Sequence, residues 1–244
     1  MLHPKKVCSQ SETSDKATNE IKVAVPLLDD IEIKGKEITA DALLTQRELA
    51  NYIVNKRQAA YYFTVKGNQP QLREDISFFF KDRKEAELTD RPSCDHGRIE
   101  TRKIWTTTEL NEYVNFPHVK QAFAIERHTT IKKSGKESTE VVYGITSQGP
   151  EQANAEHILS VNRGHWSIEN SCHYIIDWNY DEDRGRICSG YGPENITRLR
   201  RFAVAIIKYK EVRSVADKMR KLNHSVRTVF DYLRMSKNSA HLRT

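Results

Sequence analysis

A strand–helix–strand pattern in the first third of the chain constrains the fold most. Residues 37–40 and 60–65 have the composition of β-strands, and the second, Ala-Tyr-Tyr-Phe-Thr-Val, is apolar enough to be buried. Between them, Thr45-Gln46-Arg47-Glu48 has the form of a capping box and predicts a helix that runs to about Lys56. A helix between two strands predicts a βαβ unit, so the two strands should be parallel.

Polar residues follow both strands of this unit. Asp41 comes directly after the first strand, and Lys66 and Asn68 follow the second. Because ligand sites of open α/β sheets lie beyond the carboxyl ends of parallel strands, these three residues are candidates for a site. A purely structural role is the alternative for Asp41, since Asp often stabilises a strand-to-helix turn.

Strands are predicted for the middle of the chain, and helices are predicted before and after them. Pro70 should begin a helix that reaches Phe80. The expected strands are 101–107, 122–128 and 140–147, with Lys132-Lys133-Ser134-Gly135-Lys136 as the turn between the last two. The expected helices are 151–162, 165–178, 193–210 and one capped by Ser214.

Positive charge is concentrated at the end of the chain. The net charge is +6, but residues 184–244 carry 15 Lys and Arg against 4 Asp and Glu, and the preceding residues are net negative. Such a segment attracts phosphate backbones, although a solvated helix face has the same composition. The four cysteines contain no C-x-x-C pair, which excludes a zinc finger and a disulfide framework and favours a reducing cytosol. The longest apolar run, 202–207, is too short to span a membrane.

A second candidate site lies on the helix predicted at 165–178. His165, Glu169, His173 and Asp177 are spaced by four residues and would form one stripe. Large apolar neighbours favour partial burial of Glu169, and a partly buried carboxylate needs a metal ion, an Arg or a His. A Mg²⁺ ligand is one interpretation, and a zinc site of His165, Glu169 and His173 is another, although the spacing differs from H-E-x-x-H. Ordinary helix-stabilising His–Glu pairs would also explain the stripe.

Several blocks in order resemble one family. They include Thr39-Ala40-Asp41-Ala42 with Thr45-Gln46, Val65-Lys66-Gly67-Asn68-Gln69, and His96-Gly97-Arg98-Ile99-Glu100-Thr101-Arg102. Further blocks are Arg163-Gly164-His165-Trp166-Ser167-Ile168-Glu169-Asn170, Asp181-Glu182-Asp183-Arg184 and Pro193-Glu194-Asn195. From about Lys16 onward the chain is similar to DDE-type insertion-sequence transposases of the H-repeat-associated group.

The resemblance implies an RNase H-like α/β fold, a mixed sheet with flanking helices and a β-rich insertion. It implies metal-dependent cleavage and strand transfer of DNA, with two Asp and one Glu holding two Mg²⁺ ions. Asp41 matches the second Asp and Glu169 matches the Glu, so both are the expected catalytic residues and metal ligands. The implied partner is double-stranded DNA at element ends and target sites in the bacterial cytosol or nucleoid, and a homo-oligomer is allowed.

The resemblance and the charge pattern together nominate a set of DNA-contacting residues. They are Lys66, Asn68, His96, Arg98, Arg102, Arg163, His165, Arg184, Arg186, Arg200 and Arg201. For His96, Arg98 and Arg102 an ion pair with Glu100 is the alternative. The expected division is a loose lead-in at 1–20, a catalytic domain at 21–210 with its insertion at about 83–147, and basic C-terminal helices with a tail at 211–244.

One departure from the family pattern qualifies the expected activity. The first Asp normally lies upstream in an Asp-Gly-Lys context, and this chain has no such tripeptide. The expectation is therefore a transposase that is truncated at its N-terminus, with an incomplete sheet, weak Mg²⁺ binding and little or no activity. The alternatives are a non-catalytic DNA-binding remnant and, more distantly, a zinc hydrolase.

Overall fold

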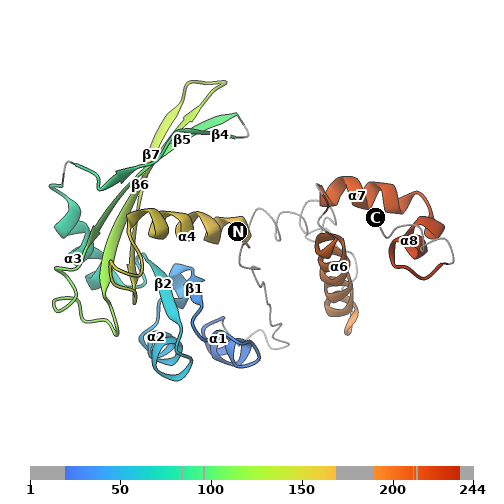
Figure 1. Cartoon of the computed structure of the whole chain (residues 1–244), viewed down its shortest axis with the longest axis horizontal. Coiled ribbons are helices and arrows are strands. Elements are labelled where there is room, and N and C mark those ends of the chain that lie inside the picture. Colours follow the sequence, from blue (N-terminus) through green and yellow to red (C-terminus); the bar gives the residue numbers. More distant parts are fainter. Residues whose placement is uncertain are drawn as a thin grey trace. The chain divides into compact units, whose positions relative to one another are not determined.

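One mixed β-sheet organises the first of two units, Met1–His165 and Trp166–Thr244 (Figure 1). The computed structural model describes residues 20–83, 85–95, 97–168, 189–210, 212 and 214–236, and in these residues the sheet has seven strands. The strands are β1 (Glu37–Ala40), β2 (Ala60–Val65), β3 (Leu88–Thr89), β4 (Ser93–Asp95), β5 (Arg98–Thr107), β6 (Gln121–Ile131) and β7 (Glu137–Thr146). Their order is β1-β2-β7-β6-β5-β3, and β4 pairs with β5.

The predicted parallel pair is confirmed. β1 and β2 have the expected bounds and pair in parallel, with Ile38 opposite Tyr61 and Ala40 opposite Phe63. All the other pairings in the described sheet are antiparallel. The carboxyl ends of β1 and β2 therefore lie side by side, which places the loops that follow them at the same edge of the sheet. The α/β class with a mixed sheet and flanking helices is thus confirmed.

Three helical segments contribute to the core on one side of the sheet. They are α1 (Glu20–Asp29), α2 (Arg47–Asn51) with its π-helical continuation η2 (Tyr52–Lys56), and α3 (Pro70–Phe80). Leu49, Ile53, Leu72 and Ile76 are buried in one cluster with alternate residues of β2, namely Tyr61, Phe63 and Val65. Because successive side chains of a strand point to opposite faces of the sheet, the odd-numbered residues of β2 all face these helices.

The opposite face of β2 and β6 packs against helix α4 (Ala155–Ile168). Ile158 and Leu159 are buried with Tyr62, Phe123 and Ile125.

The predicted break between two helices near residue 164 is wrong. Burial of the apolar face against the sheet outweighs the cost of roughly 1 kcal/mol for a glycine inside a helix. The predicted start at residue 151 is also wrong, because the Asn154 side chain caps the helix by accepting from the His157 amide at 2.9 Å.

Close packing on this face explains a glycine in β7. A Cβ atom on Gly144 would overlap the ring of Phe123 and would lie 2.8 Å from the carbonyl oxygen of Phe63. The ring of Phe123 therefore occupies the space above residue 144, and it fits there only because glycine has no side chain.

The β5-β6-β7 meander is longer than expected. The turn at Lys132–Lys136 is confirmed, but the strands reach further toward it than the predicted ranges. Their burial changes along the length: β6 is buried from Gln121 to Ile125, half-buried from Glu126 to Thr130 and exposed at Ile131, and β7 is exposed from Glu137 to Val141. The distal half of the meander therefore extends beyond the core as an arm, and Figure 1 shows its strands continuing past the helices.

The second unit is helical in its described residues. It contains α6 (Gly192–Tyr209), α7 (Val215–Asn223) and α8 (Val226–Tyr232). Pro193 lies in the first turn of α6, and the Ser214 side chain accepts a hydrogen bond from the Asp217 amide, so both predicted starts are confirmed. The ammonium groups of Lys210 and Lys218 lie 3.8 and 4.3 Å from the ring centre of Tyr232, which connects the three helices. Among the described helices, none combines the length and the apolar character needed to cross a bilayer.

Candidate active site

Asp41 lies at the carboxyl end of β1, as predicted. It is exposed and caps a short 3₁₀ helix, η1 (Ala42–Leu44), because its Oδ1 accepts a hydrogen bond from the Leu44 amide at 3.3 Å. The structural role considered for this residue is therefore confirmed. Its Oδ2 atom has no hydrogen-bond partner among the described residues, so one oxygen of the carboxylate remains available to a ligand.

The loop that carries Asp41 is anchored to β2 by Thr45. This side chain is fully buried, and its hydroxyl donates to the carbonyl oxygen of Thr64 at 2.7 Å. The predicted capping box is wrong, because α2 begins at Arg47 and its N-cap residue Gln46 makes no capping hydrogen bond. Thr45 is thus used between strands, where it joins the loop after β1 to the end of β2.

The loop after β2 holds the same segment from the other side. The Asn68 side chain donates to the carbonyl oxygen of Ala42, and the Gln69 side chain donates to the carbonyl oxygen of Thr45 at 2.9 Å. A turn closed by the Gln69 amide and the Lys66 carbonyl oxygen, 3.1 Å apart, brings both amide side chains into position. We call Thr45, Asn68 and Gln69 the loop clamp. It gives the Lys-Gly-Asn-Gln motif a physical role, namely to fix the backbone beside Asp41.

The loop clamp contains two residues that the sequence did not nominate, Thr45 and Gln69. The available signal was the pairing of two polar motifs, Thr45-Gln46 and Asn68-Gln69, each just after a buried strand.

Lys66 lies exposed in the same loop as Asn68, with no partner for its ammonium group among the described residues. DNA contacts by Lys66 and Asn68 stay predictions.

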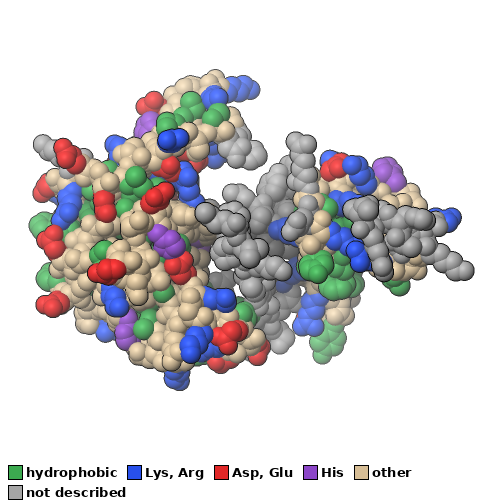
Figure 2. Space-filling view, in the orientation of Figure 1, with side chains coloured by type: hydrophobic (Ala, Val, Ile, Leu, Met, Phe, Trp, Pro, Cys, Tyr) green, Lys and Arg blue, Asp and Glu red, His purple; other side chains and the backbone are tan. Residues whose placement is uncertain are grey.

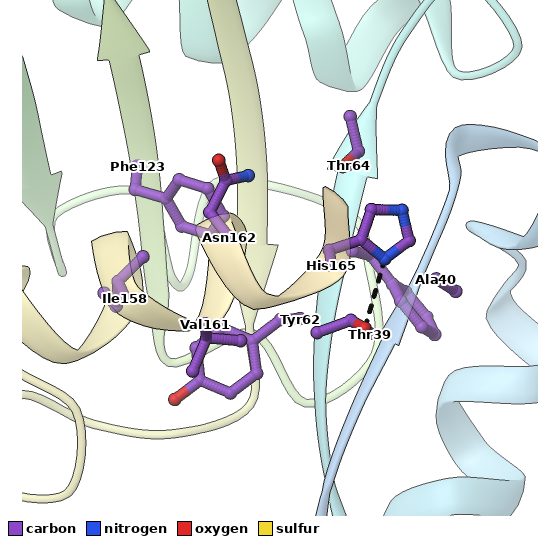
Figure 3. A pocket seen from close by; sticks show the side chains of 10 residues that line it. Thr39, Ala40, Tyr62, Thr64, Phe123, Ile158, Val161, Asn162 and His165 are labelled. Atoms are coloured by element: carbon purple, nitrogen blue, oxygen red, sulfur yellow. Dashed lines mark hydrogen bonds between the residues drawn. The ribbon is translucent and has the colours of Figure 1, made fainter. Parts of the chain in front are cut away.

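Helix α4 reaches β1 from the opposite face of the sheet (Figure 3). The Nδ1 atom of His165 lies 3.1 Å from the hydroxyl of Thr39, which is two residues before Asp41. The cavity between α4 and the strands has a volume of about 10 Å³ and is lined by Thr39, Tyr62, Phe123 and His165, among others. That volume holds at most about one water molecule, so it is a packing gap and not a substrate pocket.

Two nominated arginines make ion pairs. Arg102 Nη2 lies 2.7 Å from Glu100 Oε2, and its side chain is only 14% exposed, which matches the alternative weighed for it. Arg163 on α4 pairs with Asp90. Burial lowers the pKa of the Arg102 guanidinium, Glu100 opposes that change, and the positive charges of Arg163 and Arg127 add to it. Arg98 is exposed at the start of β5, and DNA contacts by these arginines stay predictions.

The remaining nominated residues are distributed over other parts of the chain. Arg200 and Arg201 are half-buried on α6 of the second unit. Glu169, His96, Arg184 and Arg186 lie outside the described residues, as do His173 of the zinc interpretation and the acidic run 181–183. Within the part of the chain that the structure describes, no three His, Cys, Asp or Glu side chains form a group that could hold a metal ion.

The carboxylate of Asp41 suits a hard cation in its chemistry. Mg²⁺ binds carboxylate oxygens and keeps several waters, and an exposed carboxylate with one uncommitted oxygen provides such a ligand. A single carboxylate binds such an ion weakly, so a second ligand is needed. Glu169 is the second ligand that the sequence nominates.

Comparison with known proteins gives a consistent set of relatives. No family model matches the chain. The chain is 31% identical over 209 residues to "Putative protein YbfL" of Escherichia coli K12, covering 82% of this chain and 54% of the relative. It is 28% identical over 227 residues to "Putative transposase YncI" of Escherichia coli O157:H7, covering 88% and 56%.

A third relative carries the name of the group that the sequence blocks resemble. The chain is 30% identical over 220 residues to "H repeat-associated putative transposase YhhI" of Escherichia coli K12, covering 84% of this chain and 56% of the relative. The chain thus spans about half the length of the curated relatives it matches. The ordered blocks and these relatives agree: over most of its length the chain is similar to proteins named as H repeat-associated putative transposases.

Proposed function

We propose that this chain carries part of the catalytic core of a transposase that cuts and joins DNA with the help of divalent metal ions. Asp41 and Glu169 are the proposed metal ligands, the sheet is proposed to be part of an RNase H-like core, and double-stranded DNA is the proposed substrate. The observation that carries the proposal is an exposed carboxylate, Asp41, at the shared carboxyl edge of the parallel strands, in a chain similar to these relatives.

The loop clamp supports a chemical role for this edge. Its hydrogen bonds fix the backbone at Ala42, the first residue of η1, and at Thr45, the residue after it, so the position of Asp41 depends on three side chains from two loops. Fixing a ligand in this way reduces the entropy lost when a metal binds. An exposed turn that served only to end a strand would not need such support.

The sequence carries the role proposed for Glu169, which lies outside the described residues. It belongs to the block Arg163-Gly164-His165-Trp166-Ser167-Ile168-Glu169-Asn170. Glu169 follows His165 by four residues in sequence. We propose that Glu169 completes the metal site with Asp41.

The proposed chemistry assigns simple roles to the residues of this chain. Bound Mg²⁺ would activate an attacking hydroxyl and stabilise the leaving oxygen of a phosphodiester. Asp41 and Glu169 would hold the metal through carboxylate oxygens, and the loop clamp would keep Asp41 in place. Because the chain has no Asp-Gly-Lys block, it offers two of the three expected carboxylates, and we expect weak metal binding and little or no strand cleavage by this chain alone.

Nicking of supercoiled plasmid that carries the DNA flanking the coding sequence tests this proposal. Any Mg²⁺-dependent nicking should disappear in Asp41→Asn and in Glu169→Gln and should persist in Glu112→Gln, which removes an exposed carboxylate elsewhere. Asn caps a helix about as well as Asp, so Asp41→Asn removes the metal ligand and keeps the cap. Nicking that survives both site variants would refute the proposal.

A non-catalytic DNA-binding protein is the second candidate, and the charge of residues 184–244 favours it. In that case the chain should bind duplex DNA with a steep salt dependence and should show no metal-dependent cleavage at any protein concentration.

A further inference from the structure

The end of the β5-β6-β7 arm combines two turns that lie side by side. The Lys132 amide donates to the Gly97 carbonyl oxygen at 2.9 Å, and Arg98 lies opposite Ile131 across β5 and β6. We call Arg98, Lys132, Lys133 and Lys136 the arm tip. All four side chains are exposed, and Figure 2 shows Lys or Arg side chains at the end of the arm, at the top of the view.

The turn that presents three of these cations is well defined. The amides of Ser134 and Gly135 donate to the carbonyl oxygen of Ile131 at 3.3 and 2.8 Å, and the Ile131 amide donates to the carbonyl oxygen of Lys136 at 2.9 Å. Gly135 has a φ of +66°, a conformation that glycine adopts without strain. The backbone thus holds three lysines within one closed turn.

The charges of the arm tip differ from those along the stem of the arm, which is the part of β5, β6 and β7 between the core and the turns. In the stem, each of the basic residues Arg102, Lys103, Arg127 and His128 lies within 4 Å of a carboxylate, respectively Glu100, Glu126, Glu140 and Glu137. The four cations of the arm tip have no such partner among the described residues. The ion pairs of Arg102, Lys103 and Arg127 offset positive charge along the stem, whereas the cations at its end have no such pair among the described residues, so positive potential is concentrated where the arm meets solvent.

We propose that the arm tip contacts the phosphate backbone of double-stranded DNA. The inference rests on the proposed function for the choice of DNA as the partner, and it adds a contact surface that is separate from Asp41. A narrow two-turn tip with flexible lysines suits point contacts to phosphates, which position a protein on DNA without reading its sequence.

The test measures binding of the full chain to a duplex oligonucleotide of random sequence across a range of salt concentrations. Each phosphate contact contributes about 0.9 to the slope of log affinity against log salt, so Lys132→Gln/Lys133→Gln/Lys136→Gln should lower the slope by roughly 2–3. The matched control is Lys34→Gln/Lys56→Gln/Lys81→Gln, which removes the same charge from exposed positions elsewhere on the first unit and should leave the slope unchanged. Equal slopes for the two triple variants would overturn the inference.

A second measurement uses the unmodified chain and so avoids any effect of substitution on folding. Duplex DNA should protect Lys132, Lys133 and Lys136 from acetylation at least several-fold more than Lys34 and Lys56. Tight, salt-dependent binding without protection of the arm tip would overturn this inference and leave the proposed function intact. Failure of the parent chain to bind duplex at any salt concentration would count against both.

Discussion

Replacing Gly144 by alanine tests how tightly the sheet is packed beneath α4. The added methyl group would overlap the Phe123 ring and would lie 2.8 Å from the Phe63 carbonyl oxygen, which belongs to the backbone of β2 and cannot turn away. Phe123 is 3% exposed and packs in the same cluster as Ile158 of α4, so its ring has little room to move. Overpacking of this kind costs about 1–3 kcal/mol, and contact with the backbone places Gly144→Ala at the upper end of that range.

The assay is thermal or urea unfolding of the full chain. A loss of roughly 2–3 kcal/mol corresponds to a fall in Tm of roughly 5–10 °C for a protein of this size. The matched control is Gly67→Ala, because a Cβ at Gly67 meets nothing within 4 Å and its φ is not positive. Gly67→Ala should be neutral or stabilise by up to about 1 kcal/mol. Phe123→Leu in the Gly144→Ala background should recover part of the loss, and equal Tm values for the two alanine variants would refute the packing described here.

Two further predictions concern the loop clamp and the buried tyrosines. Thr45→Val keeps the shape of a fully buried side chain and removes its hydrogen bond to Thr64, so it should destabilise the chain by roughly 1–3 kcal/mol in urea unfolding, while Thr108→Val at an exposed position should change stability by less than about 0.5 kcal/mol. Burial raises the pKa of Tyr61 and Tyr62 above the ordinary value of 10.0. Because the unfolded chain loses these protons first, stability should be complete below about pH 10 and should fall as pH rises above it. Phenolate absorbance that appears together with unfolding would agree, and phenolate formation by all the tyrosines in the folded chain would contradict this.

The parallel pair β1 and β2 could be predicted because the strand preference of its residues agrees with the packing around it. Residues 60–65 are apolar on both faces, and both faces are indeed covered, one by α2 and α3 and the other by α4. The same pattern predicts Asp41 at the carboxyl end of β1, and the structure places it there. In such segments the composition predicts the strand, because the tertiary packing favours the same structure.

Other features depended on contacts that are distant in sequence. The Thr45 hydroxyl has the sequence context of a capping residue, but its partner is the Thr64 carbonyl oxygen, nineteen residues away. The sequence predicts a gap between the helices 151–162 and 165–178, yet α4 continues through that gap and packs on the sheet. The exposed halves of β5, β6 and β7 have no amphipathic pattern beyond the core, because both of their faces meet solvent, and their length therefore could not be read from periodicity.

The central claim is that Asp41 and Glu169 hold the same divalent ion. Paramagnetic broadening of amide NMR signals by Mn²⁺ tests it directly and works even for weak binding. Millimolar Mn²⁺ should broaden the signal of the Leu44 amide, which donates to Asp41. Both Asp41→Asn and Glu169→Gln should remove this broadening, and Glu112→Gln should not. Broadening at Leu44 that is unchanged in Glu169→Gln would show that the two carboxylates do not share an ion and would contradict the proposed site.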